Sequence, residues 1–154
     1  MKKVLYLVVL LTSLSAAANT APPEISDKVI KAFKETFSEA ENVNWREMEN
    51  SCQADFKISE IKVRAIYDKE GVLLQTVRYY DEKNLPANIL AKLKNKESDK
   101  EIFGVTEIST ENEIAFHIVL KDEKNWYWMK SDAVGNMELT QKLKRADPRD
   151  RSPF

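Results

Sequence analysis

Few side chains in this sequence could support nucleophilic or metal chemistry, because its 154 residues include a single cysteine, Cys52, and a single histidine, His117. A thiolate and imidazole dyad would need these two side chains to meet, and nothing in their spacing brings them together. One Cys and one His cannot build a zinc site, attach a haem or form a disulfide framework. Acidic residues such as Glu111 and Glu113 lie in expected turns, where solvated charge is typical. The sequence therefore predicts no enzyme, no metal and no cofactor.

Large aromatic side chains are the other residues with functional potential. Trp and Tyr anchor many protein interfaces, and the chain contains three Trp and five Tyr, enough to supply both a core and a binding surface. We expect Trp45, Tyr79 and Tyr127 in the hydrophobic core. Trp126 and Trp128 fit either a core or a binding surface, and the sequence leaves both alternatives open.

The charge balance excludes nucleic acid as a partner. Lys and Arg number 24 against 25 Asp and Glu, the formal net charge is −1, and the charges are mixed along the chain rather than gathered in a basic stripe. The composition, 43% hydrophobic and 9% aromatic, describes one globular domain.

The first eighteen residues have the pattern of a secretory signal peptide. Lys2 and Lys3 precede an apolar run over residues 4–14, and Ala16 and Ala18 satisfy the small-residue requirement for cleavage. The apolar run is shorter than the roughly 20 residues that span a bilayer. We therefore expect a mature protein that begins after Ala18, with a periplasmic or secreted location and no membrane insertion after cleavage.

Export places the lone Cys52 in an oxidising compartment without an internal partner. It could be buried and inert or could link two chains, and the general tendency of free cysteines favours burial. A linker over residues 19–26 and a flexible tail over residues 144–154 are expected on either side of the domain.

Two amphipathic helices and several strands are predicted for residues 27–143. Apolar residues recur every four positions at Ile25, Val29, Phe33 and Phe37, which predicts a helix over residues 27–38 capped by Ser26 or Asp27. The same stripe returns at Leu85, Ile89 and Leu93 beside Pro86, which suits a first helical turn. Apolar and polar residues alternate over residues 54–58, 61–67, 114–120 and 137–139, a period typical of strands.

Two Asp-x-x-Gly segments show that the chain contains two copies of one unit. Asp68 and Gly71 in the first copy lie 64 residues before Asp132 and Gly135 in the second. Asp at the start of a type I turn and a left-handed Gly at its end form a hairpin with a bulge. The helices match only after a shift of a few residues, which requires an insertion or deletion between the copies. The expected fold class is α+β, a tandem α-β-β-β-β repeat over residues 27–80 and 84–143 that forms one antiparallel sheet with two helices packed on one face.

A turn over residues 122–125 would assign the two faces of the sheet. Leu120 then pairs with Tyr127 and Ile118 with Met129 on the helix side, while Val119 pairs with Trp128 and Lys121 with Trp126 on the other side. The first copy places Phe56 and Val63 inside and Asp55 and Arg64 outside. A slip of one residue in the register of residues 125–130 would turn both tryptophans inward, and this alternative stays open. The expected binding surface is the helix-free face, with Trp126, Trp128, Val119, Thr140 (beside Trp128) and His117.

Several motifs in this order resemble those of a known family. They are Phe33 and Phe37 on a helix, Val43-Asn44-Trp45, Ala54-Asp55-Phe56, the run from Ala65 to Gly71, Leu85-Pro86, and Tyr127 ahead of Asp132 and Gly135. Over residues 27–143 the chain resembles the PepSY-like, or β-lactamase-inhibitor-like, secreted proteins of Bacteroidetes. The resemblance implies a tandem repeat like that of the β-lactamase inhibitory protein, an exported location and no known catalytic residues. It does not imply inhibition of a β-lactamase, and the inhibitor's paired cysteines have no counterpart beside the lone Cys52.

These observations favour a non-enzymatic, inhibitor-like binding module that presents its helix-free face to a protein of the cell envelope, such as a peptidase or another enzyme. An alternative is a periplasmic binder of a small or extended ligand, a peptide or a glycan. A hydrolase that uses acidic turn residues ranks last. The patterns identify neither the partner nor an oligomeric state.

Overall fold

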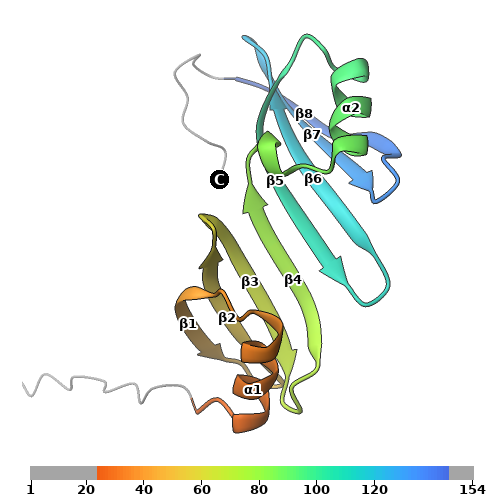
Figure 1. The fold of residues 1–154 in the computed structure, drawn as a ribbon. Coiled ribbons are helices and arrows are strands. Elements are labelled where there is room, and N and C mark those ends of the chain that lie inside the picture. The colour runs from red at the N-terminus through yellow and green to blue at the C-terminus, as the bar shows by residue number, and fades with distance from the viewer. Residues whose placement is uncertain (1–23, 146–154) are drawn as a thin grey trace, which may run out of the picture.

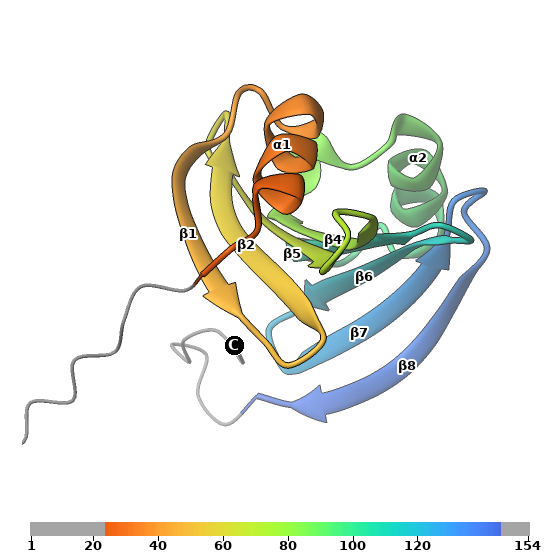
Figure 2. The ribbon, with the colours of Figure 1, turned by 90° about the horizontal axis from the view of Figure 1, so that it is seen from below.

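A computed structural model describes residues 24–145 and confirms the expected α+β fold. The signal peptide predicted over residues 1–18 and residues 146–154 lie outside this range. One antiparallel sheet contains eight strands in chain order, and both helices lie on the same side of it (Figures 1 and 2). The elements are α1 (Asp27–Thr36), β1 (Glu41–Glu47), β2 (Ser51–Ile58), β3 (Ile61–Asp68), β4 (Leu73–Tyr80), the short 3-10 helix η1 (Glu82–Asn84), α2 (Ala87–Lys96), β5 (Glu101–Thr110), β6 (Ile114–Lys121), β7 (Asn125–Asp132) and β8 (Met137–Lys144).

Each helix buries the apolar stripe that its sequence predicts. In α1 the Ser26 hydroxyl caps the first turn by accepting a hydrogen bond from the Val29 amide at 3.4 Å, and Val29 and Phe33 are buried. The helix ends at Thr36, two residues before the predicted end. In α2 the buried residues are Ile89 and Leu93.

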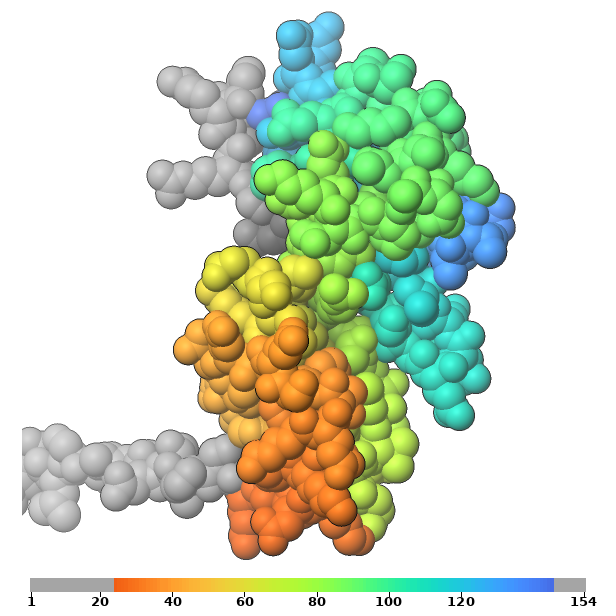
Figure 3. Space-filling model, in the orientation of Figure 1, coloured from red at the N-terminus to blue at the C-terminus, as the bar shows by residue number. Residues whose placement is uncertain are grey.

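Each copy of the repeat has its own hydrophobic core between its helix and its strands. The first core gathers Val29 and Phe33 with the inward side chains of β2 and β3, and it contains Cys52, which is buried as expected. The second gathers Ile89 and Leu93 with residues of β4 to β7. In the space-filling view the first copy, orange to yellow-green, lies below the second, green to blue (Figure 3).

The strand register of β6 and β7 is the one that the sequence predicts. Val119 pairs with Trp128 and Leu120 with Tyr127, so the slipped register is wrong. In the first copy Asp55 pairs with Arg64 on the outer side. The offset of 64 residues therefore holds for three strands of each copy.

The Asp-x-x-Gly turns are also as predicted. Gly71 and Gly135 have φ of 90° and 86°, in the left-handed region that favours glycine. The carboxylate of Asp68 accepts hydrogen bonds from the backbone amides of Glu70 and Val72, at 2.9 and 2.8 Å. The carboxylate of Asp132 accepts the corresponding hydrogen bonds in the second copy.

The insertion between the copies lies in the hairpin of β5 and β6. The residues that cap the helices, Ser26 and Pro86, are 60 residues apart, whereas β3 and β7 start 64 residues apart. Three of the four extra residues lengthen β5, which has ten residues against seven in β1. This extra length pairs with β4, where Val77 lies opposite Ile108. The insertion therefore extends the strand that joins the two copies into one sheet.

Candidate binding face

The helix-free face is the side of the sheet that neither α1 nor α2 covers. Cross-strand pairs place the same alternate residues of every strand on it, because side chains of a strand point alternately to the two faces. Its central residues are Arg64, Val77, Tyr79, Thr106, His117, Val119 and Trp128.

The two tryptophans of β7 share this face, but they differ in exposure. Trp128 is partly exposed, as predicted. Trp126 is only 6% exposed, so the prediction that it is exposed is wrong. The Phe103 ring meets it edge-on at 4.9 Å between centroids, and the Arg145 guanidinium lies over it at 5.2 Å. Trp126 therefore supports the face from within, and Trp128 is the tryptophan that the face leaves partly exposed.

The other predicted face residues divide in the same way. His117 is exposed and pairs with Lys130, whereas Val119 is buried between its neighbours Gly104 and Trp128. Thr140 is exposed but is not the pairing partner of Trp128.

A bulge explains this difference in β8. Trp128 pairs with Gln141 and Met129 with Leu139, so Thr140 is the extra residue between them. Its hydroxyl donates a hydrogen bond to the carbonyl oxygen of Trp128 at 3.0 Å.

One aromatic residue that was expected in the core belongs to the face. Tyr79 is 42% exposed and points to the helix-free side, while the adjacent Tyr80 enters the second core. In a run of two tyrosines the sequence does not show which one points inward. The pairing of β4 with β3 decides this, because it places Tyr79 opposite Lys62 on the helix-free face. Tyr127 is in the second core as predicted. Trp45 is only partly buried and packs against the first core, with its ring edge-on to Phe33 at 5.1 Å between centroids.

Phe103 is a face residue that sequence reasoning missed. Ile102 pairs with Leu120 and Gly104 with Val119, so Phe103 is the extra residue of a bulge in β5. The bulge turns its ring onto Trp126. The first copy has a register shift at the corresponding place, between Glu41 and Asn44. Aligning the two copies with an offset of 60 residues in this strand would have matched Asn44 with Gly104 and so indicated the bulge at Phe103.

A hollow of about 390 Å³ opens at the centre of the helix-free face. Its mostly apolar lining includes Tyr79, Phe103, Gly104 and Thr106, with Lys62 at the rim. A shallower depression of about 330 Å³ lies on the other side of Tyr79 and Lys62, over the strands of the first copy. In this depression both oxygens of the Asp55 carboxylate already have partners, since they accept hydrogen bonds from Arg64 at 2.8 Å and from Gln53 at 2.6 Å.

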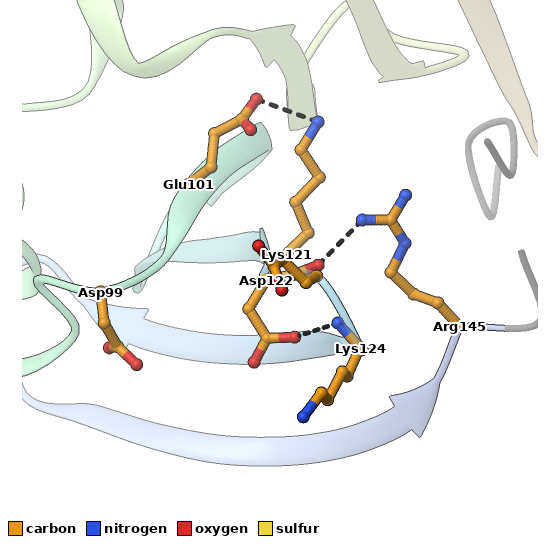
Figure 4. A pocket seen from close by; sticks show the side chains of 7 residues that line it. Asp99, Glu101, Lys121, Asp122, Lys124 and Arg145 are labelled. Atoms are coloured by element: carbon orange, nitrogen blue, oxygen red, sulfur yellow. Dashed lines mark hydrogen bonds and ion pairs between the residues drawn. The ribbon is translucent and has the colours of Figure 1, made fainter. Parts of the chain in front are cut away.

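A charged pocket of about 660 Å³ lies beside the turn between β6 and β7 (Figure 4). Several of its charged side chains are already engaged, because Lys121 lies 3.0 Å from Glu101 and Arg145 donates to the backbone carbonyl of Asp122 at 2.8 Å. The Tyr127 hydroxyl donates to the Asp122 carboxylate at 2.6 Å and, with two backbone amides, lowers the pKa of this group. A carboxylate held in this way is a structural acceptor and not a catalytic base.

Neither a metal-binding cluster nor a membrane-spanning helix is found among the described residues. Within residues 24–145, no three His, Cys, Asp or Glu side chains are grouped so that they could hold a metal ion. None of the helices in this part of the chain combines the length and apolar character needed to cross a bilayer.

No protein-family model and no curated protein matches the sequence. Solved structures do match. A BLIP-like protein from Bacteroides fragilis has a TM-score of 0.62 at 17% identity, over 87% of this chain and 94% of its own. The fold is BLIP-like. A DUF2874 family protein from Bacteroides uniformis has a TM-score of 0.58 at 15% identity, over 77% of this chain and 88% of its own.

A third match with this BLIP-like fold is described as a candidate periplasmic protein from Bacteroides eggerthii. Its TM-score is 0.59 at 16% identity, and the match covers 79% of this chain and 90% of that protein. At these identities the comparisons show that the chain shares a fold with these proteins.

Proposed function

We propose that this protein is a non-enzymatic, inhibitor-like binding module of the cell envelope, exported by its signal peptide, that holds a protein partner on its helix-free face. The observation that carries the proposal is the aromatic surface of that face. Tyr79 is exposed and Trp128 is partly exposed there, on a sheet whose other side is already covered by two helices. Exposed Trp and Tyr side chains on a rigid sheet lose little conformational entropy on binding and are typical interface anchors.

The shape of the face favours a protein over a small substrate. Both hollows are open depressions on a broad sheet, and the polar side chains of Thr106 and His117 lie between Tyr79 and Trp128 on the same face. A broad surface that combines aromatic and polar side chains is typical of a protein interface. The partner would be a soluble envelope protein such as a peptidase or another enzyme.

The location and the lack of catalysis rest on further observations. A BLIP-like protein and a candidate periplasmic protein share this fold, which agrees with the predicted signal peptide. Cys52 lies in the first core and His117 on the opposite face of the sheet, so they form no dyad. Glu111 and Glu113 are exposed beside the hairpin turn of β5 and β6, where nothing holds them as an acid and base pair.

A periplasmic binder of a small or extended ligand, a peptide or a glycan, is a second candidate. The apolar lining of the hollow beside Tyr79 favours it, because a ligand group could be buried there. Thermal stabilisation of the protein by such a molecule, without any captured protein, would support this candidate over the first.

The test is capture of a partner from envelope extract on the immobilised mature chain. Trp128→Ala and Tyr79→Ala should each weaken capture, by about tenfold or more in affinity, because each removes an exposed ring from the centre of the face. Leu139→Ala is the matched control, since Leu139 is 52% exposed on β8 and pairs with Met129 on the helix side. Equal capture by all three variants would refute the proposed face.

A further inference from the structure

The hollow beside Tyr79 exists because β5 has a glycine at its centre. A Cβ atom built on Gly104 would have no neighbour within 4 Å, so the space above it is open. The bulge directly before Gly104 sets Phe103 against Trp126 at one side, and Tyr79 with its pair Thr106 lies at the other. We call this space the Gly104 hollow.

The first copy of the repeat has a side chain at the position of Gly104. Asn44 occupies the position of Gly104, because it pairs with Asp55 after the corresponding bulge, as Gly104 pairs with Val119. The depression over the first copy is also lined mostly by apolar surface, but Asn44 is part of its lining, where Gly104 leaves the second copy open. The open space above a glycine therefore belongs to the second copy alone, where an apolar side chain could enter it.

The rim of the Gly104 hollow carries an uncompensated positive charge. Lys62 lies directly opposite Lys57 on the helix-free face, and like charges at opposed positions destabilise a sheet. Among the residues 24–145, Lys62 makes no ion pair, and the nearby Asp55 is held by Arg64. Lys57 itself reaches only Glu60, at 4.0 Å. An arrangement that costs stability in the free protein and is relieved by an anion is typical of a binding site.

We propose that the Gly104 hollow receives an acidic segment of the partner, in which one apolar side chain fills the space above Gly104 and an adjacent carboxylate pairs with Lys62. This inference rests on the proposed function and adds the chemistry of the partner. Tyr79 contacts both parts of the segment, because it lines the hollow together with Lys62. A buried apolar anchor beside a charge pair provides both affinity and orientation.

A random peptide library displayed on phage tests the chemistry without knowledge of the partner. Selection on the immobilised protein should enrich peptides with Asp or Glu within two residues of a large apolar residue. Enrichment of basic peptides, or no enrichment over the unselected library, would overturn the proposal.

Two variants locate the binding of a selected peptide. Gly104→Leu fills the hollow, and the open space at this position lets the variant fold; Lys62→Glu reverses the charge of the rim. Each should weaken the peptide by about tenfold or more. Thr110→Leu, on the same strand and face but away from the hollow, and Lys34→Glu, on α1, should leave affinity within about twofold. Circular dichroism melting confirms that each variant is folded, and equal effects of variants and controls would overturn the proposal.

The captured partner separates this inference from the proposed function. If Trp128→Ala and Tyr79→Ala weaken capture but Gly104→Leu and Lys62→Glu do not, the face binds a protein and the acidic segment is wrong. If none of the four weakens capture, the proposed function fails as well.

Discussion

Trp126 and Trp128 lie on the same side of β7 but differ in exposure, because Phe103 packs against Trp126 and not against Trp128. Phe103 reaches Trp126 through the bulge of β5, and Arg145 covers the other part of its ring. Trp128 lies one pair further along, over Val119, and keeps part of its surface exposed. A buried ring contributes to stability and an exposed ring is available to a partner, so the two substitutions should have opposite consequences.

Trp126→Ala should lower the free energy of unfolding by roughly 3–5 kcal/mol, because it leaves a cavity between Phe103 and Arg145. Trp128→Ala should cost about 1 kcal/mol or less and act mainly on binding. Urea denaturation followed by far-UV circular dichroism measures both. Equal losses of stability would mean that Trp128 is as much a core residue as Trp126.

The carboxylate of Asp122 links stability to acid pH. Hydrogen bonds from Tyr127 and from backbone amides lower its folded-state pKa below the ordinary value of 3.8, so its contribution is present above that pH and is lost as the pH falls further. Asp122→Asn keeps an acceptor for the turn but removes the charge. It should be less stable than the wild type at pH 7, with a difference that narrows below about pH 4.

Urea denaturation from pH 7 to pH 2.5 measures this dependence. Glu123→Gln is the matched control, since Glu123 is an exposed carboxylate in the same turn. Its effect on stability should not change with pH in the way that Asp122→Asn does. A constant difference for Asp122→Asn would contradict the assigned role.

At the scale of elements, each helix is tied to the Asp-x-x-Gly turn of its own copy. Lys28 on α1 pairs with Glu70 of the first turn, and Lys92 on α2 donates to the backbone carbonyl of Val134 at 2.8 Å in the second. The glycines lie directly beneath these helices, so they serve both the left-handed turn and the close approach of the helix.

Gly71→Ala should be more destabilising than Gly135→Ala. Both variants strain a left-handed backbone, at roughly 1–2 kcal/mol each. The added Cβ at Gly71 would lie 3.0 Å from the carbonyl oxygen of Lys28, which is backbone, whereas at Gly135 it would meet the movable side chain of Lys92 at 2.8 Å. Thermal melts of both variants measure the difference.

A second substitution tests the cause of this difference. Lys92→Ala should recover part of the loss in Gly135→Ala, because it removes the obstructing side chain. The corresponding change in the first copy, Lys28→Ala, should recover none of the loss in Gly71→Ala, where the obstruction is backbone. Equal losses and equal recovery in both copies would contradict the packing described for the turns.

At the scale of the whole molecule, two separate cores are joined across β4 and β5. A polar link lies at this seam. Glu107, on β5 with a side chain only 13% exposed, accepts a hydrogen bond from the Tyr80 hydroxyl at 2.5 Å and another from Arg78 at 3.3 Å. Burial, together with the Glu107 carboxylate, raises the pKa of Tyr80, so this hydroxyl remains a donor.

Glu107→Ala should therefore lower the free energy of unfolding by about 1–3 kcal/mol, because it leaves the hydroxyl of Tyr80 without its acceptor. Adding Tyr80→Phe should recover part of this loss, since the unpaired donor is removed as well. Urea denaturation of the single and double variants measures the coupling. Additive losses would show that the hydrogen bond does not join the two strands energetically.

The sequence by itself determined the elements, the repeat and the two faces of the sheet, for a local physical reason. The four-residue stripe of Val29 and Phe33, the alternation around Ile118 and the left-handed glycine at Gly71 each act over a few neighbouring residues. Pairs such as Val119 with Trp128 then follow from the length of the turn that joins their strands.

The tertiary structure alone decided which residues of the helix-free face are exposed. Bulges change the register by one residue without a clear mark in the sequence, and those in β5 and β8 moved Phe103 onto Trp126 and Thr140 out of its expected pair. Burial of Trp126 and the Gly104 hollow depend on side chains from strands that are distant in the chain, and such contacts are set only when all eight strands pair.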